Sequence, residues 1–122
     1  MPTQPHGATL TATRVEAADH DKCVIADSDG TPVANVRVAD HGPSVQLTFT
    51  ISLGHLSMIT RRELVDAVFR LPELSAARAV QAAAPLGDAE LLHLLLERLD
   101  QISTRAAGVT CLIEGITRKV HL

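Results

Sequence analysis

The sequence predicts an α+β fold of two layers, in which a mostly antiparallel sheet carries two helices on one face. The first observation behind this prediction is the stretch 45–53, which alternates apolar and polar side chains without a break. A two-residue period of that length is typical of a strand with one buried face and one polar face. The second observation is a set of turn sequences before residue 45, and the third is a change to helical periodicity after residue 60.

Four strands are expected in the first half of the chain, at residues 8–16, 23–26, 33–39 and 45–53. The sequence Asp-Ser-Asp-Gly-Thr-Pro at 27–32 predicts a tight turn, because Asp-Gly accepts positive φ and Pro closes the turn. The sequence Asp-His-Gly-Pro at 40–43 predicts a second turn. Strands joined in this way form an antiparallel meander.

Two helices and two further strands are expected in the second half. Thr60 and Glu63 have the spacing of a capping box, so a helix is expected from Thr60 to just before Pro72. Residues 78–84 are interpreted as a strand, although their alanine content suits a helix equally. Asp88 is expected to cap a longer helix that ends near Gly108, followed by a strand at 109–116. The apolar stripe of that longer helix consists of Leu91, Leu92, Leu95, Leu99 and Ile102.

Length, composition and charge restrict the function classes. A chain of 122 residues predicts a single domain spanning 1–122, with tails at 1–7 and 117–122. A net charge of −3, with two Phe and no Tyr or Trp, argues against a nucleic-acid partner, which needs basic and stacking surfaces. No apolar run approaches the ~18 residues that cross a bilayer, and no signal peptide is evident. We therefore expect no membrane partner and a cytoplasmic, bacterial protein.

The order of elements from Cys23 onward resembles the GCN5-related N-acetyltransferase (GNAT) fold. The hairpin at 24–36 carries most of the resemblance, because it consists of an apolar strand, an acidic turn that contains Gly, and a returning strand. The resemblance implies three further features, which this chain lacks. The acetyl-CoA loop, Gln/Arg-x-x-Gly-x-Gly/Ala, should open the helix after the long strand, yet residues 53–64 contain only Gly54. A helix pair should separate the first two strands, yet only residues 17–22 are there. Many members use a tyrosine as general acid, and there is none here.

These departures predict a shortened, non-catalytic relative that acts by binding, with no catalytic residue and no cofactor. The missing helix pair would leave one sheet face open to solvent, to a second copy of the chain in a homodimer, or to a ligand. Leu94 and Leu96 lie off the main stripe of their helix and offer a second candidate surface for the homodimer. The residues expected on the open face as interface residues are Thr9, Thr11, Thr13, Gln46, Thr48, Thr50 and Ser52, with Asn35, Gln81 and Thr110 beside them.

A small acyl or anionic ligand has one candidate site, formed by Gly54, His55, Arg61 and Arg62 around the start of the first helix. It supports an alternative function, a reduced acyltransferase that binds coenzyme A. A second alternative is a structural subunit of a larger complex. No metal site is expected, because the six histidines show no ligand spacing. No serine or cysteine lies in a nucleophile elbow.

Overall fold

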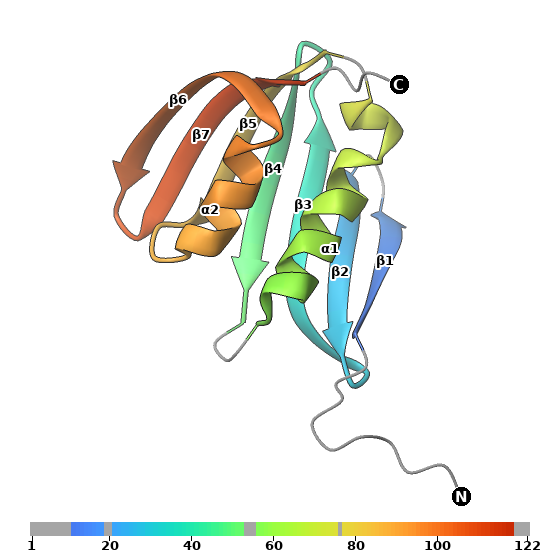
Figure 1. Cartoon of the computed structure of the whole chain (residues 1–122). Helices are drawn as coiled ribbons and strands as arrows, with labels where there is room; N and C mark the ends of the chain where they lie inside the picture. Colours follow the sequence, from blue (N-terminus) through green and yellow to red (C-terminus); the bar gives the residue numbers. More distant parts are fainter. Residues whose placement is uncertain (1–10, 19–20, 53–55, 76, 119–122) are drawn as a thin grey trace, which may run out of the picture.

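The described residues form a single sheet of seven strands with two helices on one of its faces, as Figure 1 shows. The computed structural model describes residues 11–18, 21–52, 56–75 and 77–118. The strand order is β1-β2-β3-β4-β5-β7-β6, and every neighbouring pair is antiparallel except β4 with β5. The expected two-layer α+β class is confirmed.

The first half of the chain forms the expected meander. Its strands are β1 (Thr11–Ala18), β2 (Asp21–Ser28), β3 (Thr31–Asp40) and β4 (Ser44–Ile51). The turn between β2 and β3 has positive φ at Asp29 and Gly30, as the Asp-Gly sequence predicts. Only two residues of the sequence separate β1 from β2, which leaves no room for a helix pair.

The second half begins with α1 (Met58–Phe69) and a short 3-10 turn, η1 (Pro72–Leu74). Then come β5 (Ala79–Pro85), α2 (Ala89–Leu96), β6 (Leu99–Ala107) and β7 (Thr110–Thr117). The expected strand at 78–84 is confirmed as β5. β7 lies between β5 and β6 in the sheet and reaches the first residue of the expected tail, Thr117, which is buried.

The expected long helix from Asp88 to Gly108 is wrong in its second half. Asp88 does cap α2, accepting the N–H of Leu91, but the helix ends at Leu96. Residues 99–107 form β6, which pairs with β7 through a turn where Gly108 has a φ of 63°. The apolar residues at 91–102 fit a helical period, but hydrogen bonding to β7, a partner further along the chain, decides the structure of their second half.

The start of α1 also differs from the expected capping box. Ser57, not Thr60, is the N-cap, and its Oγ accepts the backbone N–H of Thr60 at 3.1 Å. Thr60 lies within the first turn, where its hydroxyl forms a 2.8 Å hydrogen bond with the Ser57 hydroxyl. Both residues are acceptable caps, so the sequence offered two starting points three residues apart.

The hydrophobic core fills the space between the sheet and the two helices. Leu94 is 4% exposed and belongs to this core, and Leu96 packs against it. The expected dimer contact at Leu94 is therefore wrong, because its side chain is already buried within the chain. The largest fully buried side chains include Leu47, Leu64, Leu91, Leu95, Leu99 and Ile113. Among the described residues, no helix is long and apolar enough to cross a membrane.

Candidate functional site

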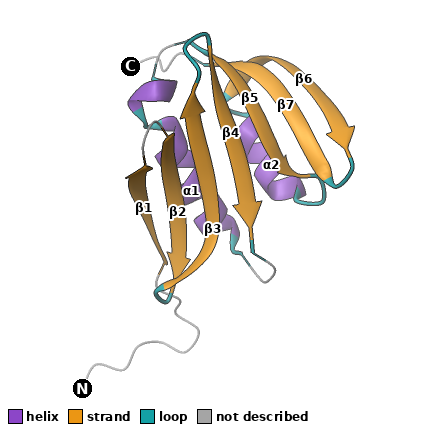
Figure 2. Cartoon of the chain, turned by 180° about the vertical axis from the view of Figure 1, so that it is seen from behind, coloured by secondary structure: helices purple, strands orange, loops and turns teal. Residues whose placement is uncertain are grey.

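The sheet face opposite the helices is the first candidate site, and Figure 2 views it directly. Directly paired residues of neighbouring strands lie on the same face of the sheet, so the strand register shows which residues belong to each face. Val36, Leu47, Ala82 and Ile113 point to the helices and are buried. The residues between them form what we name the bare face: Cys23, Ile25, Asn35, Arg37, Gln46, Thr48, Thr50, Gln81, Ala83, Leu112 and Glu114.

The register places six of the ten residues expected there on the bare face. Gln46, Thr48 and Thr50 of β4 are exposed there, and Asn35 pairs directly with Thr50. Gln46 also pairs with Gln81 of β5. At the far end of β5, Thr110 pairs with Pro85 on the same face.

Of the threonine row expected in the first strand, Thr13 does not belong to the bare face. Thr13 pairs with Ala26, which is buried under the helices, so Thr13 lies on the helix side of the sheet. Thr11 is described only through its backbone pairing with Ser28, and Thr9 lies outside the described residues. The face on which a strand residue lies depends on the register with the neighbouring strand, which the alternation of β1 alone does not give.

The bare face is more apolar and more charged than the sequence indicated. Ile25 and Leu112 are half-buried there, which means that the face offers apolar surface as well as hydroxyl and amide groups. Arg37 accompanies them, and its guanidinium pairs with Asp21, with 2.7 Å from Nε to Oδ2. The one described lysine, Lys22, pairs with Val38 on the helix side. Arginine with apolar side chains and no lysine is the composition of many protein interfaces.

The bare face is hollowed in the half of the sheet that contains β5, β7 and β6. A depression of about 240 Å³ lies over β5 and β7, where the small side chain of Ala83 leaves space beside Leu112. Arg105 belongs to its rim and comes from β6, which the sequence had assigned to a helix. The polar residues of the rim come from four strands and are Gln46, Gln81, Arg105 and Glu114.

The second candidate site lies where α1 and α2 begin, beside the ends of β4 and β5. The surface there forms an open depression of about 430 Å³. Ser52, expected on the bare face, is exposed just past the end of β4 and lines this depression instead. Its other lining residues are Ile51, Arg61, Pro85, Gly87, Asp88, Ala89 and Glu90.

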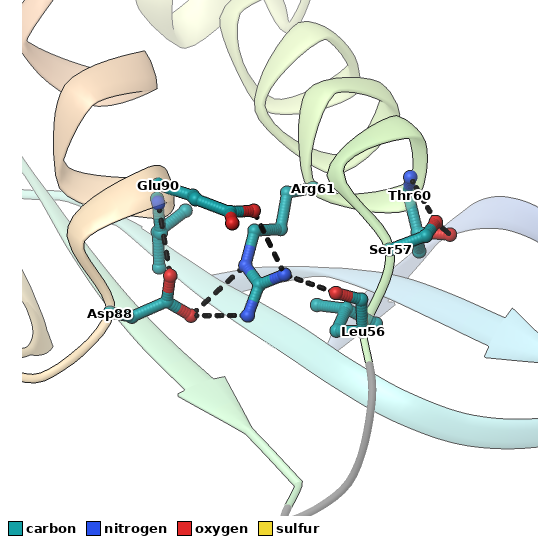
Figure 3. Close-up of polar contacts among 7 residues, drawn as sticks. Leu56, Ser57, Thr60, Arg61, Asp88 and Glu90 are labelled. Carbon is teal, nitrogen blue, oxygen red and sulfur yellow. Dashed lines mark hydrogen bonds and ion pairs between the residues drawn. The ribbon is translucent and has the colours of Figure 1, made fainter.

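Arg61 is held by acidic and carbonyl groups within this depression, as Figure 3 shows. Its Nε and Nη2 lie 3.1 and 3.0 Å from Oδ2 of Asp88, and its Nη1 lies 3.4 Å from Glu90 and also donates to the carbonyl of Leu56. The side chains of Arg61 and Asp88 are only 15% and 9% exposed. The guanidinium expected to bind an anion therefore has partners already, and two carboxylates outnumber one arginine.

The remaining residues of the expected anion site add little to it. Arg62 is exposed and lies outside the depression. Gly54 and His55 lie outside the described residues. The sequence had indicated Asp88 as a helix cap but not as the partner of Arg61, because the two residues are 27 positions apart. Among the described residues, no group of three or more His, Cys, Asp or Glu side chains is arranged to hold a metal ion.

Comparison with known proteins finds similar structures but no similar sequence. No family model and no curated protein matches the sequence. An acetyltransferase of the GNAT family from Streptococcus pneumoniae superposes with a TM-score of 0.59 at 13% identity, covering 84% of this chain and 70% of the other. A putative acetyltransferase from Sphaerobacter thermophilus gives 0.56 at 14% identity, with coverages of 81% and 70%. A putative phosphinothricin N-acetyltransferase gives 0.55 at 12% identity, with coverages of 86% and 75%.

This chain has a GNAT-like fold. The likeness rests on three-dimensional structure alone, since these identities are far below the level at which shared residues carry an argument. The resemblance inferred from the hairpin at 24–36 is thus confirmed at the level of the fold. In this chain α1 follows β4, and two residues join β1 to β2; these are the two places where the sequence resemblance implied a coenzyme loop and a helix pair.

Proposed function

We propose that this chain is a non-catalytic binding domain that uses a GNAT-like fold to pair with a second copy of itself. The observation that carries the non-catalytic part is the ion pair between Arg61 and Asp88. It occupies the start of α1, where a coenzyme pyrophosphate would need free N–H groups and positive charge. With Glu90 beside it, the formal charge of this cluster is −1, from one arginine and two carboxylates, and that charge repels a pyrophosphate.

The bare face supports the homodimer. Seven strands at about 4.8 Å spacing and eight residues of length offer on the order of 900 Å², close to the ~800 Å² per partner of a standard interface. Thr48, Thr50 and Gln81 are uncharged hydrogen-bonding groups, which lose less on desolvation than charges do. No helix of the described residues covers this face, so it is accessible to a second copy.

A coenzyme titration tests the non-catalytic part. Coenzyme A and acetyl-CoA at millimolar concentration should leave the melting temperature unchanged, because only a ligand that binds the native state raises it. ADP at the same concentration controls for general nucleotide and salt effects. A rise in melting temperature that saturates with coenzyme A but not with ADP would refute the non-catalytic proposal.

A charge introduced on the bare face tests the homodimer. The double variant Thr48→Arg/Thr50→Arg should reduce a native dimer to monomers, because arginines of the two copies would meet in the interface. Thr13→Arg is the matched control, since Thr13 is an exposed strand threonine on the other side of the sheet. Light scattering measures the particle mass. If the double variant stays a dimer, the interface lies elsewhere.

The alternative of a reduced acyltransferase that binds coenzyme A has one observation in its favour. The parallel pairing of β4 with β5 ends at Thr48 and Ala83, although β4 continues to Ile51. Beyond that point lies the depression of about 430 Å³, bounded by the last residues of both strands. The neighbouring structures of this fold are acetyltransferases. The coenzyme titration separates this alternative from the binding domain.

A further inference from the structure

One carboxylate differs from all others in the described part of the chain. Each described Asp and Glu except Glu114 takes part in an ion pair, a hydrogen bond or another electrostatic interaction. Glu114 lies in the middle of β7, is exposed, and points out of the bare face beside the hollow over Ala83. This carboxylate at the centre of a strand is therefore available to a partner.

A free cation lies next to this carboxylate. Arg105 of β6 pairs with Leu112, two residues before Glu114 on the same face of β7, so the two charged residues are diagonal neighbours. Within the described residues no hydrogen bond or ion pair involves the side chain of Arg105. Arg14, Arg37, Arg61, Arg78, Arg98 and Arg118 each have a carboxylate partner. Among the described arginines, Arg62 and Arg70 also lack one, but they belong to α1 and its C-cap, away from the bare face. One positive and one negative group thus stand side by side at the rim of the hollow without pairing to each other.

A surface that pairs with its own copy about a two-fold axis must be complementary to itself. A patch that carries one charge of each sign meets this condition, because the rotation places each charge opposite its counterpart. We propose that Arg105 pairs with the partner's Glu114, and Glu114 with the partner's Arg105, at the centre of the dimer. This inference rests on the proposed function and specifies which part of the bare face lies on the two-fold axis.

The surroundings of the two residues suit this role. Ala83 and Leu112 provide an apolar floor that excludes water when covered, which strengthens an ion pair across the interface. The amides of Gln46 and Gln81 complete the rim and are able to both donate and accept hydrogen bonds. The hollow itself leaves space for the long side chains of the opposing copy.

Complementary charge reversal tests the proposal. Arg105→Glu alone, or Glu114→Arg alone, should raise the dissociation constant of the dimer at least about tenfold, because like charges then meet at both contacts. An equimolar mixture of the two single variants should form mixed dimers, and the double variant Arg105→Glu/Glu114→Arg should dimerise with itself. Arg70→Glu, at an exposed arginine after α1, controls for the change in net charge. Light scattering gives the masses, and native mass spectrometry distinguishes mixed from like dimers.

The outcomes separate this inference from the proposal on which it rests. A native monomer at every concentration would refute self-association, and the two-fold arrangement with it. A native dimer whose dissociation constant does not respond to either single reversal would overturn only the role of Arg105 and Glu114. Loss of dimer in both single variants without recovery in the mixture would also overturn it, since reciprocal pairing requires that recovery.

Discussion

Asp40 and Arg78 show how single residues tie distant parts of the sheet together. Asp40 ends β3, and Arg78 precedes β5. Their side chains form two contacts, of 2.9 Å and 3.0 Å, and the N–H of Gly42 adds a third hydrogen bond to Asp40 at 2.9 Å. The guanidinium of Arg78, followed by this N–H, lowers the pKa of Asp40 from 3.8 to about 2.

The stability of the protein at acidic pH should depend on Asp40. A carboxyl group whose pKa falls on folding stabilises the native state above its unfolded pKa, and this contribution is lost as the pH drops through the folded pKa. Asp40 should therefore make wild-type stability fall between about pH 4 and pH 2. Denaturant titrations across that range should show a smaller fall for Asp40→Asn. An identical pH profile for both proteins would contradict the role assigned to Asp40.

The contribution of the Arg61–Asp88 ion pair to stability should also be measurable. Asp88→Asn keeps an oxygen to accept the N–H of Leu91, but it leaves the largely buried Arg61 without its main counter-charge. We expect a loss of about 1–3 kcal/mol in the free energy of unfolding, and part of it should return in Arg61→Leu/Asp88→Asn. Urea denaturation measures both. A single variant as stable as the wild type would show that the contact contributes nothing.

At the scale of elements, prediction succeeded where one short segment carries its own signal. β4 has a perfect two-residue period and a turn before it, so residues 45–53 predicted nearly the strand found at Ser44–Ile51. The prediction for the segment of β6 was wrong for the opposite reason. Its only buried residue is Leu99, and its conformation depends on pairing with β7 rather than on its own pattern. Gly108 was expected to end a helix, but it forms the turn between β6 and β7, because glycine suits both a helix end and a hairpin turn.

The junction of β6 and β7 depends on a glycine. A Cβ on Gly115 would lie 3.0 Å from Cβ of Leu99 and 3.1 Å from the carbonyl oxygen of Asp100. Gly115→Ala should therefore cost about 1–3 kcal/mol, because the first residues of β6 must move. Gly87→Ala is the control, since nothing lies within 4 Å of a Cβ there. Equal stability of the two variants in chemical denaturation would contradict this packing.

At the scale of the whole molecule, the sequence predicted the fold class and the uncovered sheet face, because both follow from element order and from what is missing between β1 and β2. The candidate site was less predictable. Thr48 and Thr50 were found from alternation alone, whereas the pairing of Arg61 with Asp88 and the neighbourhood of Arg105 and Glu114 required the register. Side chains brought together by strand pairing leave no signal in the local sequence.

The mass of the native particle, measured by light scattering over a range of concentrations, tests the central claim most directly. The account predicts twice the chain mass of 13.0 kDa, unchanged when coenzyme A is added. A particle of 13.0 kDa at all concentrations would contradict a bare face that binds a second copy of the chain.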